Sequence, residues 1–173
     1  MRFKVIVTAI VTAVGVFSLA GCGNKQDNKK EIAAVPEANY DLSAESNAKF
    51  LKDNAAKKGV TTLPSGLQYR VIKSGNGKSP HGPEDLVTVT YKGWLINGKV
   101  FDQTQPGQTA QFPAGHLIQG WVEALRLMKE GDEWELVIPS ELAYGEQGAG
   151  SDIPPNQVLV FDMQLIQVAP APQ

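Results

Sequence analysis

The sequence predicts an α+β domain in which a curved antiparallel sheet of about five strands wraps over one short helix. Apolar and polar residues alternate in several short segments after residue 66, as in half-buried strands. One segment, residues 118–128, instead has apolar residues at helical spacing. The 17 glycines and 11 prolines favour short elements joined by turns. A chain of 173 residues has room for one such domain, with a lead-in helix and a flexible tether before it.

The N-terminus has the pattern of a signal peptide. Arg2 and Lys4 form a short basic start, and residues 5–20 follow without a charge. This apolar run is somewhat short for a membrane-spanning helix of about 20 residues. It ends in residues 19–22 (LAGC), which resemble the lipobox of bacterial lipoproteins, and Cys22 is the only cysteine of the chain.

The resemblance to a lipobox implies a signal peptide at residues 1–21 and a lipidated Cys22 that carries a diacylglycerol and an acyl chain such as palmitate. An uncleaved signal anchor with an incidental cysteine is the alternative. The residue after the cysteine is Gly23. Under the sorting rule of enteric bacteria, lipoproteins with Asp at this position are retained and do not reach the outer membrane. We therefore expect a lipid anchor at the outer membrane of a bacterial cell envelope.

Residues 22–42 are polar and charged without a periodic apolar face, which predicts a flexible tether. Ser43 is a candidate N-cap for a lead-in helix over residues 43–59, with Gly59 as its stop. The apolar positions of this helix form only a thin stripe, namely Ala48, Phe50, Leu51 and Ala55. Pro64 is expected to break the chain before the folded domain begins.

The folded domain is expected over residues 66–168, with a short tail at 169–173. Alternation predicts strands at residues 67–71, 87–91 (extended by 94–96), 100–101, 134–138 and 159–165. Asn97 and Gly98 between two of them predict a type I′ hairpin turn. Apolar residues spaced three, four and three positions apart predict the short helix, namely Ile118, Trp121, Leu125 and Met128. Gly131 is the expected stop of that helix.

Charge and composition argue against several classes of function. With 16 basic and 18 acidic side chains the net charge is −2, which argues against binding nucleic acid through bulk charge. A single cysteine excludes a disulfide framework within the chain and a cysteine-based zinc site. His81 and His116 have no companion nucleophile, so neither a Ser-His-Asp arrangement nor a metal centre is expected. We expect no cofactor and no metal.

Six aromatic residues stand out because most of them lie beside turns or at the ends of elements. They are Tyr91, Phe101, Phe112, Trp121, Tyr144 and Phe161. From the pattern alone they fit either an ordinary aromatic core or the lining of a binding pocket.

Five motifs follow one another through the domain. In chain order they are residues 87–93 (VTVTYKG), 97–102 (NGKVFD), 117–121 (LIQGW), 142–145 (LAYG) and 153–162 (IPPNQVLVFD). Their order and spacing resemble the FKBP-type peptidyl-prolyl cis-trans isomerases. Residues 47–51 and 64–69 are similar to the bacterial envelope branch of that family. The lipoprotein signal at the N-terminus also resembles that branch. The resemblance implies an FKBP-like fold and an isomerase (rotamase) activity on X–Pro peptide bonds.

The resemblance also implies roles for individual residues. It implies Trp121 as the floor under a proline ring, with walls from Tyr91, Phe101, Phe112, Leu117, Ile118 and Phe161. It further implies that the Tyr144 hydroxyl and the Ile118 backbone N–H hold substrate carbonyls. Asp102 would lie at the polar edge of this pocket.

The implied function is isomerisation of proline-containing segments in exported proteins, which assists their folding. Binding of macrolides of the FK506 type is a further implication. Ala110, Ala149 and Asp152 depart from the residues frequent in the family, and these changes bear on macrolide affinity and substrate preference more than on activity. The alternative is a lipid-anchored peptide-binding adaptor or holdase that uses the same pocket, with incidental isomerase activity.

Overall fold

The computed structural model describes residues 40–171. The expected signal peptide, Cys22 and almost all of the expected tether lie outside the described residues. The helices are α1 (Ala44–Ala55) and α2 (Gln119–Leu127), with 3-10 turns η1 (Ser140–Leu142) and η2 (Gly145–Gln147). The strands are β1 (Val60–Thr62), β2 (Gln68–Lys73), β3 (Leu86–Leu95), β4 (Val100–Gln103), β5 (Ala110–Pro113), β6 (Glu133–Ile138) and β7 (Leu159–Ala169).

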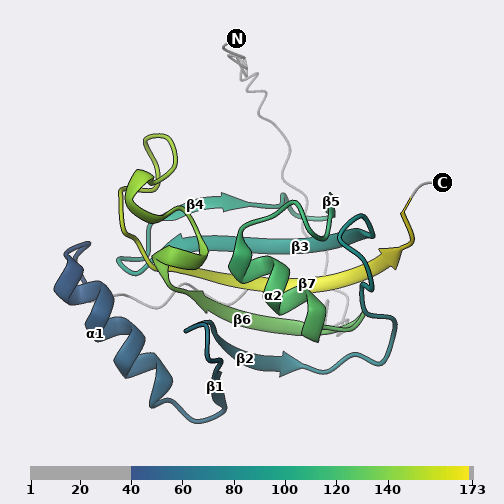
Figure 1. The fold of residues 1–173 in the computed structure, drawn as a ribbon, viewed down its shortest axis with the longest axis horizontal. Helices are drawn as coiled ribbons and strands as arrows, with labels where there is room; N and C mark the ends of the chain where they lie inside the picture. The colour runs from purple at the N-terminus through teal and green to yellow at the C-terminus, as the bar shows by residue number, and fades with distance from the viewer. Residues whose placement is uncertain (1–39, 172–173) are drawn as a thin grey trace, which may run out of the picture. The chain divides into compact units, whose positions relative to one another are not determined.

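All seven strands join one antiparallel sheet in the order β1-β2-β6-β7-β3-β4, and β5 pairs with the first half of β3 (Figure 1). Helix α2 lies across one face of this sheet, which we call the inner face. The predicted α+β class with a sheet over a short helix is confirmed. There are seven strands rather than about five, because β1 and β5 have three and four residues, too few for alternation to reveal them. The chain does not break before Pro64, since β1 already belongs to the sheet.

The main core lies between α2 and the inner face. Three of the four apolar positions predicted for this helix are buried in it, namely Trp121, Leu125 and Met128. The fourth, Ile118, is the N-cap residue and is half-buried. Helix α2 ends at Leu127, a few residues before Gly131, whose φ of +92° turns the chain towards β6.

The hairpin between β3 and β4 differs from the predicted type I′ turn. A type I′ turn needs positive φ at both central residues, whereas of Asn97 and Gly98 only Gly98 has it, at +85°. The Gly98 N–H donates to the Leu95 carbonyl at 2.8 Å, and the Leu95 N–H donates to the Lys99 carbonyl at 3.0 Å. The loop therefore holds three residues, and the extra one, Ile96, is buried with 1% of its surface exposed.

Helix α1 begins as predicted, with the Ser43 Oγ accepting from the Ser46 N–H at 3.2 Å. It ends at Ala55, before the expected stop at Gly59. The predicted apolar stripe is wrong in two of its four positions, because Ala48 and Ala55 are exposed. The other two, Phe50 and Leu51, pack against a second apolar cluster formed by Trp94, Ile96, Val137, Val158 and Val160.

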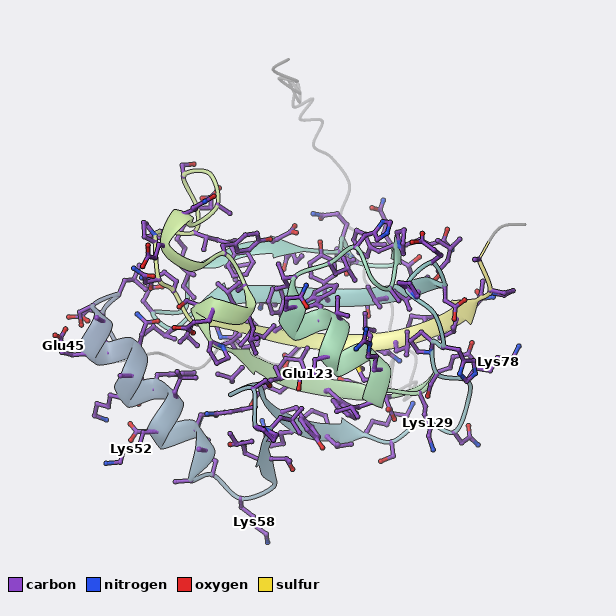
Figure 2. The ribbon with its side chains drawn as sticks, viewed as in Figure 1. Glu45, Lys52, Lys58, Lys78, Glu123 and Lys129 are labelled. Carbon is purple, nitrogen blue, oxygen red and sulfur yellow. The ribbon has the colours of Figure 1, made fainter. Side chains whose placement is uncertain are left out.

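The buried side chains of α1 are two asparagines, Asn47 and Asn54, and not the alanines that the sequence predicted. The Asn47 Oδ1 accepts from the Val158 N–H at 2.8 Å, and its Nδ2 donates to the Gln157 Oε1 at 3.2 Å. The Asn54 Nδ2 donates to the Gln68 Oε1 at 2.9 Å. Amide hydrogen bonds therefore hold α1 to the domain, while its charged side chains such as Glu45 and Lys52 point away from the sheet (Figure 2).

The second apolar cluster lies on the outer face of the sheet, opposite α2. Trp94, Val160 and Val137 occupy matched positions on β3, β7 and β6, and their strand neighbours point to the main core. Two residues further along the strands, a row of charged side chains crosses the same face: Arg70, Glu135, Asp162 and Lys92. Arg70 and Glu135 in this row form an ion pair at 3.0 Å.

Candidate active site

Trp121, in the first turn of α2, lies in the middle of a cluster of aromatic rings on the inner face. Its side chain is 5% exposed. Its ring centroid lies 5.0 Å from Tyr91, 5.2 Å from Phe161 and 6.2 Å from Phe112, each in an edge-to-face arrangement. Such arrangements suit the charge distribution of aromatic rings, so the Trp121 ring is held in a fixed orientation. Within residues 40–171 its indole N–H has no hydrogen-bond partner.

Four different strands supply the other rings of the cluster. Tyr91 comes from β3, Phe101 from β4, Phe112 from β5 and Phe161 from β7. Phe161 is 4% exposed and meets Phe101 edge-to-face at 5.5 Å. The remaining three are half-buried, so the cluster has an accessible side. The structure thus brings together five of the six aromatic residues that the sequence singles out, while their role as substrate contacts stays a prediction.

A hydrogen bond joins two predicted site residues at the rim of the cluster. The Tyr91 hydroxyl donates to the Asp102 Oδ2 at 2.6 Å, and the Asp102 side chain is exposed. Burial, together with this bond, raises the pKa of Tyr91 above its ordinary value. The Tyr91 hydroxyl therefore keeps its proton at neutral pH and remains the donor.

Two hydrogen-bond donors near the cluster are unused. Tyr144, at the start of η2, is 41% exposed, and its hydroxyl forms no hydrogen bond within residues 40–171, although it interacts electrostatically with Tyr91. The Ile118 backbone N–H, at the N-cap of α2, also has no partner in that part of the chain. Leu117 is half-buried against the main core beside it. Both groups are thus free to donate a hydrogen bond to a carbonyl oxygen of a bound peptide.

The loop that follows Tyr144 is tied to the β3–β4 hairpin. Lys99 Nζ and Asp152 Oδ1 form an exposed ion pair at 2.9 Å. Ala149 and Ile153 close the loop with two backbone hydrogen bonds, at 2.8 and 3.1 Å. Asp152 and Ala149, two of the departures from the family's pattern, therefore take part in the structure of this loop.

Gly93 is a site residue that sequence reasoning missed. A Cβ atom at this position would lie 2.6 Å from Phe161 Cε1 and 2.8 Å from Phe101 Cζ. Both rings therefore need a residue without a side chain beneath them. The signal that could have revealed it is a glycine in the middle of a long strand, which often marks a close approach.

No group of three or more His, Cys, Asp and Glu side chains in residues 40–171 is placed to hold a metal ion. In the same range, no helix has the length and the apolar character needed to cross a membrane.

Two family models match the chain. The model of the FKBP-type peptidyl-prolyl cis-trans isomerase matches residues 77–166, which include the whole aromatic cluster. The model of the domain amino terminal to FKBP-type peptidyl-prolyl isomerase matches residues 12–71, which include α1.

Curated relatives have similar names. The chain is 48% identical over 136 residues to the FKBP-type 22 kDa peptidyl-prolyl cis-trans isomerase of Escherichia coli, covering 78% of this chain and 66% of that protein. It is 45% identical over 148 residues to the outer membrane protein MIP of Legionella longbeachae, covering 83% and 63%. It is 51% identical over 127 residues to the peptidyl-prolyl cis-trans isomerase Mip of Coxiella burnetii, covering 73% and 55%. The chain thus spans between about half and two thirds of these relatives.

Solved structures show the same fold. The crystal structure of FkpA from Escherichia coli matches with a TM-score of 0.70 and 43% identity, covering 74% of this chain and 60% of that one. A peptidyl-prolyl cis-trans isomerase from Pseudomonas syringae matches with a TM-score of 0.67 and 39% identity, covering 72% and 92%. In sequence, in fold and in the order of its motifs, the chain belongs to the FKBP-type peptidyl-prolyl cis-trans isomerase family.

Proposed function

We propose that the chain catalyses cis–trans isomerisation of X–Pro peptide bonds in its aromatic cluster. The observation that carries this proposal is the surroundings of Trp121. Its buried ring is enclosed edge-to-face by three other rings, and two unused donors, on Ile118 and Tyr144, lie near the cluster. An apolar floor suits a proline ring, and the donors suit the carbonyl groups on either side of it.

The chemistry needs neither an acid nor a base. Rotation about an X–Pro bond crosses a barrier of about 18–20 kcal/mol because the planar amide loses its resonance. The planar amide is more dipolar than the twisted one. A dry apolar pocket therefore destabilises the ground state more than the transition state, and each ~1.4 kcal/mol of this difference gives a factor of ten in rate.

In this proposal every site residue has a stated role. Trp121 is the floor beneath the proline ring. The walls are Tyr91, Phe101, Phe112, Leu117, Ile118 and Phe161. The Tyr144 hydroxyl and the Ile118 N–H hold substrate carbonyls, and Asp102 fixes the Tyr91 hydroxyl at the rim.

A protease-coupled isomerisation assay of the full chain with a proline-containing peptide tests the activity. Tyr144→Phe keeps the ring and removes one hydrogen bond, so we expect kcat/KM to fall about two- to tenfold at unchanged Tm. Tyr69→Phe is the matched control, because Tyr69 stacks on Trp134 outside the cluster, and it should leave kcat/KM unchanged. A wild-type rate equal to the uncatalysed rate would refute isomerase function and favour the adaptor or holdase.

We further propose where this activity acts. The proposed clients are proline-containing segments of exported proteins, and macrolides of the FK506 type are proposed ligands of the same pocket. A lipid on Cys22 and a tether over residues 22–42 would hold the domain at 66–168 near the outer membrane. The name of the Legionella relative, an outer membrane protein, supports an envelope location. Mass spectrometry of the membrane fraction tests the anchor: wild-type Cys22 should carry acyl chains, and Cys22→Ser should remain uncleaved.

A further inference from the structure

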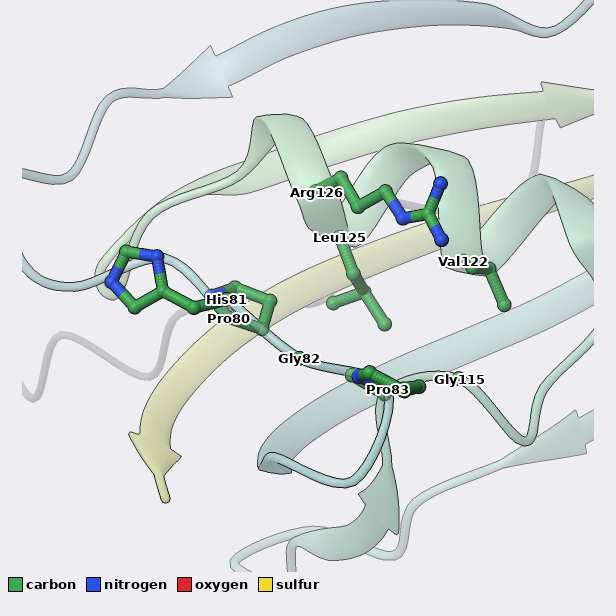
Figure 3. A pocket seen from close by; sticks show the side chains of 9 residues that line it. Pro80, His81, Gly82, Pro83, Gly115, Val122, Leu125 and Arg126 are labelled. Atoms are coloured by element: carbon green, nitrogen blue, oxygen red, sulfur yellow. The ribbon is translucent and has the colours of Figure 1, made fainter. Parts of the chain in front are cut away.

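A cavity of about 170 Å³ lies between α2 and the loop before β3. None of its lining residues belongs to the aromatic cluster. They are Pro80, His81, Gly82, Pro83, Ala114, Gly115, Val122, Leu125 and Arg126. Figure 3 shows Val122 and Leu125 extending from α2 towards the segment that carries Pro83. Apart from His81 and Arg126, the lining side chains are apolar or absent.

Hydrogen bonds hold the loop on the far wall of this cavity in place. The Asp85 Oδ2 accepts from the N–H groups of His81 and Gly82 at 2.7 and 3.0 Å. These bonds lower the pKa of Asp85, so it stays ionised at neutral pH. The Gly115 N–H also donates to the Pro83 carbonyl at 2.7 Å. Because these bonds hold residues 81–83 in place, the cavity is formed before any ligand arrives.

One positive charge beside the cavity is uncompensated. Arg126 has no hydrogen-bond or ion-pair partner within residues 40–171. Its side chain runs along α2 towards Val122 (Figure 3). The carboxylates in the loop have contacts of their own, since Asp85 binds backbone N–H groups and the Glu84 Oε1 lies 3.0 Å from the His116 Nε2. The site therefore combines a hollow that is lined in part by apolar side chains with a free guanidinium.

We propose that this cavity binds a small organic carboxylate. An engineered cavity of about 150 Å³ with apolar walls holds one benzene molecule, so a single ring or branched aliphatic group fits here. That group packs against the exposed Pro83 ring, with Leu125 buried directly behind the cavity wall, and the carboxylate pairs with the planar Arg126 guanidinium, whose geometry suits two parallel hydrogen bonds.

The test is a methyl NMR titration of the full chain with two probes, 4-methylpentanoate and its neutral isostere 4-methylpentanamide. We expect saturable shifts at the Val122 and Leu125 methyl groups. The acid should bind about fivefold more tightly than the amide, as for a solvent-exposed ion pair. Arg126→Gln should remove this preference and leave amide binding intact. Lys129→Gln is the matched control, because Lys129 is an exposed cation just beyond the end of α2 and outside the cavity lining (Figure 2).

Three results would overturn the proposal. The first is the absence of saturable shifts at Val122 and Leu125 while both variants remain folded. The second is equal affinity for acid and amide in the wild type, which would mean that the guanidinium takes no part. The third is an equal loss of preference in Lys129→Gln, which would reduce the effect to general surface charge.

Discussion

The two faces of the sheet bury their side chains in different ways. On the inner face, Trp121 and Phe161 sit among other aromatic rings, and contacts between ring edges and ring faces fix their positions. On the outer face, the buried side chains of α1 are Asn47 and Asn54, and hydrogen bonds fix their positions. Contacts between aromatic rings therefore organise the inner face, whereas on the outer face the amide hydrogen bonds of α1 supplement an apolar cluster.

This difference suggests separate roles for the two faces, with ligand binding on the inner face and stabilisation of the fold on the outer face. On the inner face the donors of Ile118 and Tyr144 have no partner in residues 40–171. On the outer face, by contrast, Asn47 both donates and accepts, and it satisfies a buried backbone N–H. Donors without a partner beside a dry apolar surface can bind a ligand. Donors that already form hydrogen bonds within the protein contribute only to the stability of the fold. Substitutions that disturb one face at a time test this difference.

The largest expected effect comes from Gly93→Ala on the inner face. The new Cβ would meet Phe161 and Phe101 at less than 3 Å, so both rings must move. We expect a loss of about 1–3 kcal/mol in the free energy of unfolding, and at least a tenfold loss of kcat/KM because the pocket loses its shape. Gly82→Ala is the control, since the nearest atom to its added Cβ is 4.0 Å away. Wild-type kcat/KM in Gly93→Ala would show that these rings do not shape the active pocket.

Asn47→Ala should damage only the outer face. It leaves the buried Val158 N–H without its acceptor, at a cost of about 1–3 kcal/mol. Urea unfolding should show this loss, while kcat/KM of the folded variant stays at the wild-type value. Asn76→Ala, at an exposed loop position, should change neither quantity. If kcat/KM fell in Asn47→Ala, the two faces would be coupled rather than separate.

Asp162→Asn tests the charged row on the outer face. Burial, followed by the nearby Glu135 and Glu133, raises the pKa of Asp162 to about 6, against the opposing effect of Lys92 and Arg70. The folded pKa lies above the unfolded value of about 3.9, so the folded state binds the proton more tightly. This carboxylate therefore destabilises the fold above pH 6, and the penalty fades as the pH falls towards 4.

We expect Asp162→Asn to be about 1–2 kcal/mol more stable than the wild type at pH 8, after allowance for partial exposure. The advantage should disappear near pH 4, where the wild-type carboxyl is also neutral. Urea unfolding at the two pH values measures it. An equal gain in the free energy of unfolding at pH 8 and at pH 4 would show that the effect comes from packing rather than from charge.

Sequence patterns predict those parts of the fold that depend on one element and one face. A three-four-three spacing locates α2, because a helix that packs on a sheet needs such an apolar stripe; its residues are Ile118, Trp121, Leu125 and Met128. The same logic fails for α1, where polar Asn47 and Asn54 normally indicate an exposed face. Their partners are as distant in sequence as Gln157, which no local pattern can reveal.

The candidate site shows the same limit. The motifs single out Tyr91, Phe101 and Trp121, because their resemblance to a family carries three-dimensional information. The need for glycine at position 93 and the bond from Tyr91 to Asp102 depend instead on the pairing of β3 with β4. That register follows from the three-residue hairpin together with a register shift between Gly93 and Trp94, and the Asn97-Gly98 pattern predicted neither.

The smallest expected effect, and the sharpest test of mechanism, is at Asp102. Its carboxylate accepts from the Tyr91 hydroxyl at 2.6 Å and is exposed at the rim. If the pocket works by desolvation and carbonyl fixation, no proton moves, and wild-type kcat/KM should be flat across the range where carboxylates and histidines titrate. Tyr91 does not disturb this range, because its pKa is raised.

Asp102→Asn keeps an oxygen that can accept from Tyr91, so we expect kcat/KM to fall by no more than about threefold, the value of part of one hydrogen bond. Asp102→Leu removes the acceptor and should lose more. A general acid or base would contribute about 10²–10⁴-fold, so the two mechanisms differ well beyond experimental error. The measurement is the pH–rate profile of the wild type and of Asp102→Asn, with circular dichroism to confirm folding at each pH. A wild-type inflection that vanishes in Asp102→Asn, together with a nearly inactive variant, would replace the proton-free mechanism by acid–base catalysis at the rim.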